Sequence, residues 1–61
     1  MKYFSIDSAG GTNMCAGIDD EAVARRTAQK LANELSEVVF LYSDEPGDGE
    51  VIEPEQPGAN A

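Results

Sequence analysis

The stretch that decides the fold of this chain is DDEAVARRTAQKLANELSEVVFLY, residues 19–42. Within it, residues 20–37 contain neither glycine nor proline and consist largely of good helix formers, so they predict an α-helix. Asp19 or Asp20 can accept hydrogen bonds from the free amides of the first helical turn. With Glu21, these residues also suit the positive end of the helix dipole.

One side of this helix is predicted to be buried and the other solvated. Apolar and small side chains recur three and four positions apart, which predicts one narrow buried face. That face comprises Ala24, Thr27, Ala28, Leu31, Leu35 and Val38. The opposite, solvated side comprises Arg25, Arg26, Gln29, Lys30 and Asn33. The i,i+4 pairs available on the surface, worth about 0.2–0.5 kcal/mol each, are Glu21 with Arg25 and Lys30 with Glu34.

The segments on either side of the helix read as strands. Residues 38–42 are rich in β-branched and aromatic side chains, and their nearly continuous apolar character predicts a central strand, or one whose second face a partner covers. Residues 2–7 alternate, with Phe4 and Ile6 on one face, which predicts a half-buried strand. Residues 50–53 predict a short final strand after the Pro-Gly and Asp-Gly turn at positions 45–49.

A second strand is predicted at residues 14–18, after a glycine-containing turn at residues 8–13. Met14, Ala16 and Ile18 would face inward, and Gly17 would mark a bulge or the end of the strand. The resulting fold class is α+β with the order ββαββ: one helix packed on a small, mostly antiparallel sheet. If this second segment were instead a loop, the order would be βαββ.

Residues 1–53 are therefore predicted to form a single small α+β domain, and residues 54–61 a flexible acidic tail with proline and glycine. A chain of 61 residues buries little core and is marginally stable, which keeps homodimerisation open. Cys15 is the only cysteine, so a disulfide within the chain is excluded. It is expected to be a small buried strand residue.

The composition favours binding over catalysis. The chain has no histidine, and nothing is placed to activate Cys15 as a nucleophile, so we expect no enzyme activity, no catalytic residue and no cofactor. Gly10-Gly11-Thr12 has no lysine nearby and reads as a turn rather than a phosphate-binding loop. The acidic stretch at residues 44–50 lacks the alternating ligand spacing of a calcium loop, so no metal site is predicted.

The charge of the chain indicates what kind of partner it could have. Twelve acidic residues against four basic ones give a net charge of −8. This excess repels nucleic acid and anionic membranes, attracts basic protein surfaces, and leaves too few basic residues for phosphate contacts. The candidate partner-binding residues are Asp19, Asp20, Glu21, Asp44, Glu45, Asp48, Glu50 and Glu53. The partner would be a larger basic protein or nucleoprotein complex, with no direct nucleic-acid contact and no membrane.

The short acidic chain, the helix of type DEAVARRTAQKLANEL (residues 20–35) and the closing VVFLY strand (residues 38–42) resemble small proteins of bacteriophages and mobile elements. Among these, the anti-CRISPR proteins are similar in size, charge and build. The resemblance spans residues 2–53 and includes no sequence motif, so no site residues carry over. It implies a non-enzymatic inhibitor that covers a nucleic-acid-binding surface of a bacterial protein.

The alternative function is a homodimeric structural or assembly module, in which the charge serves only solubility. Such a dimer would bury the 38–42 strand or an exposed face of the sheet. The first residues lack the apolar run of a signal peptide, and no stretch is long enough to span a bilayer. The expected location is therefore the cytoplasm, which would be the bacterial cytosol for a phage-encoded protein.

Overall fold

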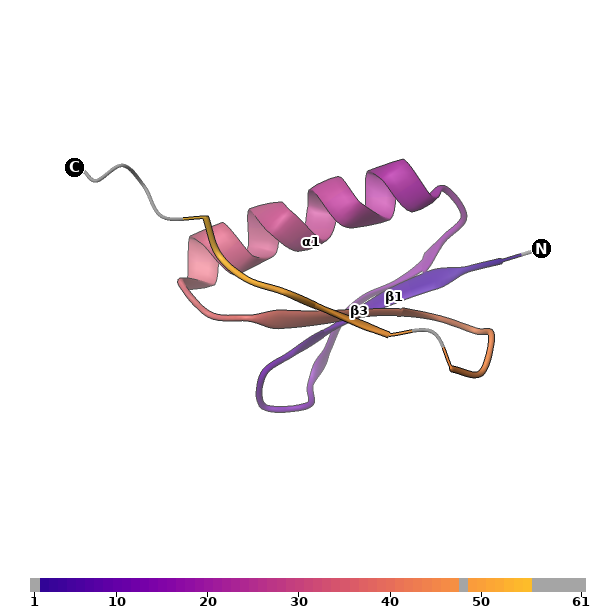
Figure 1. Ribbon diagram of the computed structural model, residues 1–61, viewed down its shortest axis with the longest axis horizontal. Helices are drawn as coiled ribbons and strands as arrows, with labels where there is room; N and C mark the ends of the chain where they lie inside the picture. Colours follow the sequence, from indigo (N-terminus) through magenta and orange to yellow (C-terminus); the bar gives the residue numbers. More distant parts are fainter. Residues whose placement is uncertain (1, 48, 56–61) are drawn as a thin grey trace.

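The computed structural model of the protein describes residues 2–47 and 49–55. It confirms the α+β class and the order ββαββ. The strands are β1 (Phe4–Ser8), β2 (Asn13–Ile18), β3 (Val39–Ser43) and β4 (Glu50–Ile52), and the helix is α1 (Glu21–Leu35). The four strands form one antiparallel sheet in the order β2-β1-β3-β4, and α1 runs along one face of it (Figure 1).

The helix begins one residue after the start of the predicted span, residues 20–37, and ends two residues before its end. Asp20, rather than Asp19, is the N-cap: its backbone is extended, and its carboxylate accepts a hydrogen bond from Val23 N at 3.2 Å. At the other end, Ser36 adopts a left-handed conformation (φ 55°), and its N–H donates to the carbonyl of Ala32. This capping turn ends the helix before Glu37, the last residue of the predicted span.

The buried face of α1 is narrower than its sequence predicts. Its fully buried residues are Ala24, Ala28 and Ala32, whose spacing of four forms a single stripe. Ala32 was not among the predicted positions. Leu35 was, but its side chain is 44% exposed because it lies at the last residue of the helix. Small side chains along the stripe let the helix lie close to the sheet, where the core is completed by Phe4, Ile6, Val39, Leu41 and Ile52.

Strand β3 is central, between β1 and β4, as its apolar sequence predicts. Val39 and Leu41 are buried, whereas Phe40 is exposed and Tyr42 is half-buried. Because successive side chains of a strand point to opposite faces, Phe40 and Tyr42 lie on the face that α1 does not cover. One helix therefore covers only one side of this sheet.

Strand β2 is irregular, and its irregularity corrects one prediction. Phe4 pairs with Ile18 and Ile6 pairs with Cys15, so two steps along β1 match three steps along β2. Gly17 lies in this bulge with a φ of 77°, as the sequence anticipated for a bulge. The extra residue reverses the alternation of the strand, so the prediction that Ala16 faces inward was wrong. Ala16 is exposed, and the partly buried Cys15 packs against the core instead.

No helix in the part of the chain that the structure describes has the length and apolar character to cross a membrane. The predicted tail begins at Pro54. Of its residues only Pro54 and Glu55 are described, and residues 56–61 lie outside the described ranges.

Enlarging the alanine stripe should destabilise the protein. We expect Ala28→Leu to lower the free energy of unfolding by about 1–3 kcal/mol, because added methylenes in a packed core force backbone shifts. Ala22→Leu, the same change at an exposed helical position, is the matched control and should have little effect. Urea denaturation followed by circular dichroism measures both. Equal stability of the two variants would show that the helix does not depend on close approach to the sheet.

Candidate functional site

The two acidic segments of the sequence meet at one end of the molecule. The loop before α1 and the turn after β3 lie together there, because β2 ends, α1 begins, β3 ends and β4 begins at the same end of the sheet (Figure 1). We call this region the acidic end. Its described carboxylates are Asp19, Asp20, Glu21, Asp44, Glu45 and Glu50, all of them exposed.

Two of the predicted site residues are not part of this group. Asp48 lies outside the described residues. Glu53 follows β4, which runs away from the acidic end, so the structure places it at the opposite end of the sheet. There it joins other acidic residues near the end of α1 and the start of β3. We call this second group the far end, and it comprises Glu34, Glu37, Glu53 and Glu55.

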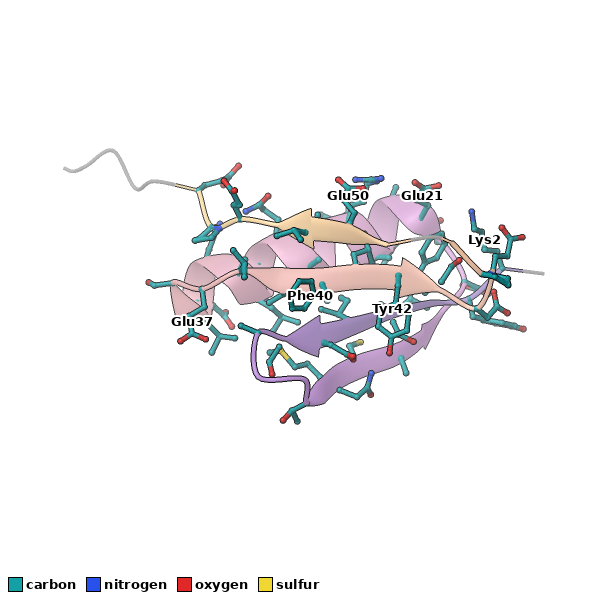
Figure 2. All side chains as sticks on the ribbon, turned by 60° about the horizontal axis from the view of Figure 1, so that its bottom comes forward. Lys2, Glu21, Glu37, Phe40, Tyr42 and Glu50 are labelled. Carbon is teal, nitrogen blue, oxygen red and sulfur yellow. The ribbon has the colours of Figure 1, made fainter. Side chains whose placement is uncertain are left out.

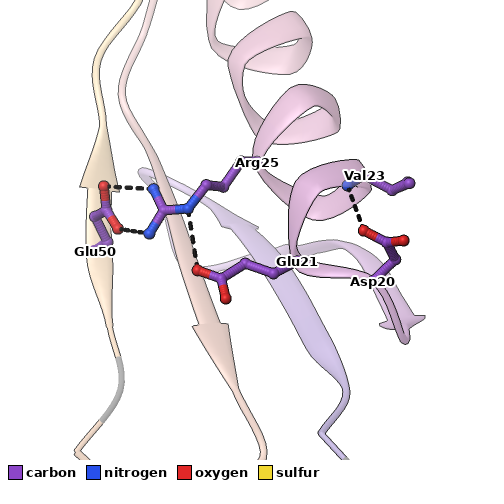
Figure 3. Close-up of polar contacts among 5 residues, drawn as sticks. All are labelled: Asp20, Glu21, Val23, Arg25 and Glu50. Carbon is purple, nitrogen blue, oxygen red and sulfur yellow. Dashed lines mark hydrogen bonds and ion pairs between the residues drawn. The ribbon is translucent and has the colours of Figure 1, made fainter.

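Arg25 joins the two acidic segments (Figure 3). Its guanidinium donates two hydrogen bonds to Glu50, with Nη1 to Oε2 at 2.9 Å and Nη2 to Oε1 at 2.6 Å. Its Nε donates to Glu21 Oε2 at 3.2 Å, which confirms the predicted i,i+4 pair. The hydrogen bonds from Arg25 are the main cause that lowers the pKa of Glu50, and the bonds to Glu50 and then Glu21 raise the pKa of Arg25. Glu21 and Glu50 are thus partly neutralised within the chain.

The remaining carboxylates of the acidic end are held by local contacts. Asp44 N donates to Tyr3 O at 3.0 Å, and Tyr3 N donates back to Asp44 Oδ1 at 3.3 Å. Glu45 lies 3.4 Å from Lys2 Nζ and is exposed. Among the described residues of this end, Glu45 pairs with Lys2, and Glu21 and Glu50 pair with Arg25, whereas Asp19, Asp20 and Asp44 form no ion pair. The acidic end is therefore strongly negative and anchored to the strands beside it.

A cleft of about 230 Å³ opens at the acidic end, between the start of α1 and the β3–β4 turn. Phe4 and Leu41 contribute apolar surface to it, and its charged lining includes Lys2, Arg25 and Glu50. These charged groups already pair within the chain, Lys2 with Glu45 and Arg25 with Glu50. In residues 2–47 and 49–55, no three carboxylate or cysteine side chains are grouped so that they could hold a metal ion.

A second polar contact was missed by the sequence analysis. Arg25, Gln29 and Asn33 were assigned to the solvated side of the helix, yet they face β4 and the residues that follow it. Gln29 Nε2 donates to the carbonyl of Glu53 at 2.8 Å, and Asn33 Oδ1 accepts from Glu55 N at 2.8 Å. The sequence does contain a signal for these contacts. The three residues are spaced four apart, and each one directly follows an alanine of the buried stripe. These hydrogen bonds hold the chain around β4, a strand of only three residues, against α1.

The sheet face opposite α1 presents apolar side chains to solvent (Figure 2). We call it the open face. Phe40 and Val51 are paired across β3 and β4, and they are 38% and 52% exposed. Next to them, Tyr42 Oη donates to Asp7 Oδ1 at 3.2 Å, and Asn13 Nδ2 donates to the same oxygen at 3.0 Å. Asp7 had no assigned role in the sequence, because only strand pairing brings these residues together.

No protein-family model matches this chain, and no curated protein or solved structure shows significant similarity to it.

The ion pair between Arg25 and Glu50 should make stability depend on pH. Because the pKa of Glu50 is lower in the folded state, the pair stabilises the fold at neutral pH, and this contribution is lost as the pH falls through the folded-state pKa. We expect Glu50→Gln to be less stable than the parent protein at about pH 7, with the gap closing towards about pH 2. Both side chains are half exposed, so added salt should also reduce the gap.

Urea denaturation across this pH range provides the measurement. Glu34→Gln, which removes an exposed helical carboxylate with no described ion pair, is the control and should show a smaller gap at neutral pH. A gap for Glu50→Gln that persists unchanged at low pH would assign the stabilisation to something other than the ion pair.

Proposed function

We propose that this chain is a non-enzymatic protein-binding module whose acidic end covers a basic surface of a larger protein or nucleoprotein complex. The observation that carries the proposal is the convergence of two acidic segments, some 25 residues apart, at one end of a small fold. In its specific form, the module is an inhibitor of the anti-CRISPR type that acts in the bacterial cytosol. It would occupy a surface that otherwise binds nucleic acid.

The local anchoring of the carboxylates supports this use of the charge. Asp20 is fixed by its capping bond, and Asp44 by its exchange of hydrogen bonds with Tyr3. Each of these carboxylates keeps lone pairs that can accept further hydrogen bonds. Groups held in place before binding lose little side-chain entropy when a partner's arginine or lysine engages them. Such carboxylates can occupy the positions that phosphates would take on a basic surface.

The distribution of charge also predicts the rate of association with the partner and its dependence on salt. A strongly negative end attracts a positive surface over a distance, so association is fast and weakens with ionic strength. Glu21 and Glu50 contribute less than the other carboxylates, because Arg25 already compensates part of their charge. Lys2 lies 3.4 Å from Glu45 and compensates part of its charge as well, so the residues expected to dominate binding are Asp19, Asp20 and Asp44, with a smaller contribution from Glu45.

A pair of charge-matched variants tests this assignment. The acidic-end variant carries Asp19→Asn, Asp20→Asn, Asp44→Asn and Glu45→Gln. Asparagine at position 20 still caps a helix, and at position 44 it still offers an oxygen to Tyr3 N. The far-end variant carries Glu34→Gln, Glu37→Gln, Glu53→Gln and Glu55→Gln. Both remove four negative charges, so they differ only in where the charge was.

The measurement is capture of proteins from a bacterial lysate at low and at high salt, with duplex DNA as competitor. We expect the parent protein and the far-end variant to retain a partner that the acidic-end variant loses, and expect salt and DNA both to displace it. Equal capture by the two variants would mean that the acidic end is not the contact. Capture that DNA does not displace would contradict a contact on a nucleic-acid-binding surface.

A further inference from the structure

The open face presents apolar side chains that α1 leaves uncovered. Phe40 and Val51 lie side by side across β3 and β4, and Tyr42 continues the row along β3. Asp7 is the one charged residue that the strand alternation places among them. In a chain where more than a quarter of the residues are charged, a sheet face this poor in charge points to an interaction surface.

Acidic groups border the open face at both ends of β3. Asp44 and Glu45 follow the last residue of the strand at the acidic end. Glu37, which Figure 2 labels, precedes the strand at the far end. A second copy packed face to face would place acidic residues against acidic residues, whether the two sheets ran parallel or antiparallel. Like charges brought together in this way oppose association. A homodimer through this face is therefore disfavoured by the charge at both of its ends.

The same arrangement suits an apolar surface with positive charge at its borders. We propose that the open face binds a basic amphipathic helix of the partner, with its apolar side on Phe40, Tyr42 and Val51. This inference rests on the proposed function, because it takes the partner to be basic. Lysine or arginine side chains at either end of that helix would reach Asp44 and Glu45 on one side and Glu37 on the other.

The dimensions of the protein set the length of such a helix. The 15 residues of α1 run along the opposite face of the same sheet (Figure 1). At about 1.5 Å per residue they span roughly 22 Å, so a partner helix of similar length would reach both acidic borders. Asp7 offers a further acceptor in the middle of the face, because the bonds from Tyr42 and Asn13 both reach its Oδ1 and leave its other oxygen available. The partner helix would complete a layer that one helix cannot supply.

A designed peptide tests the open face directly. The probe is an 18-residue peptide with leucines along one helical side, arginines along both flanks, and a single tryptophan among the leucines. Because the protein contains tyrosine but no tryptophan, fluorescence excited at a wavelength that tyrosine does not absorb reports only on the peptide. A peptide of the same composition with its order scrambled has the same charge but no apolar side. We expect the amphipathic peptide to bind with a blue shift, and the scrambled peptide to bind at least about tenfold more weakly.

Two further variants locate the contact. Phe40→Thr with Val51→Thr removes two exposed apolar side chains of the open face and places threonine, a β-branched residue that favours strands, at both positions. Val23→Gln with Leu35→Gln removes two helical side chains of similar exposure, 39% and 44%, and is the matched control. We expect the open-face variant to lose affinity by at least about tenfold and the helix control to keep it. Circular dichroism of both variants confirms that each is folded.

Several outcomes would overturn the inference. Equal binding of the two peptides, or binding by the open-face variant as tight as that of the parent protein, would mean that charge alone causes the peptide to bind. A parent protein that sediments as a dimer, together with an open-face variant that sediments as a monomer, would make a second copy the occupant. In the lysate experiment, a partner that the acidic-end variant loses and the open-face variant retains would overturn this inference and leave the proposed function standing. A partner that both variants retain would overturn the proposed function itself.

Discussion

Close packing of three alanines against one face of a four-stranded sheet is the constraint on which this structure depends. Ala24, Ala28 and Ala32 are fully buried, and larger residues from the sheet, such as Ile6 and Val39, fill the space across from them. A chain this short buries a smaller fraction of its surface than a larger domain does, so its core has to be dense to be stable. The small side chains on the helix make that density possible, because they let the backbones approach.

The same constraint explains why polar contacts surround the core. Directly beside the alanine stripe, Arg25, Gln29 and Asn33 bond to β4 and to the residues after it. A strand of three residues has few ladder bonds of its own, and side-chain bonds from the helix hold it at the edge of the sheet. Arg25 therefore stabilises the fold as well as lying at the acidic end. Because it already binds Glu21 and Glu50, these two carboxylates are less available for the proposed contact.

A single helix also leaves the sheet covered on one side only. The face opposite α1 carries Phe40 and Val51, which are paired across β3 and β4, and Asp7 is the one acidic residue that the strand alternation places among its side chains. Apart from Asp7, charged and apolar side chains are thus separated in space although they are mixed in the sequence. In the proposed function, this arrangement would give the partner two different features to recognise: a negative end that steers it, and a mostly apolar face against which it can pack.

The sequence by itself determined the elements and their type. Helix formers without glycine or proline, strand alternation and turn residues are local signals, and they predicted ββαββ and the i,i+4 pair of Glu21 and Arg25. The apolar sequence of residues 38–42 predicted either a central strand or one whose second face a partner covers, and the strand order confirms the central position. Only the tertiary structure decided which residues meet. Strand order brought the loop before α1 to the turn after β3 and sent Glu53 to the other end, and a bulge at Gly17 exchanged Ala16 for Cys15. These placements depend on pairing between segments that are distant in the sequence. In such pairing, a shift of one residue in the register moves the side chains that follow to the other face of the sheet.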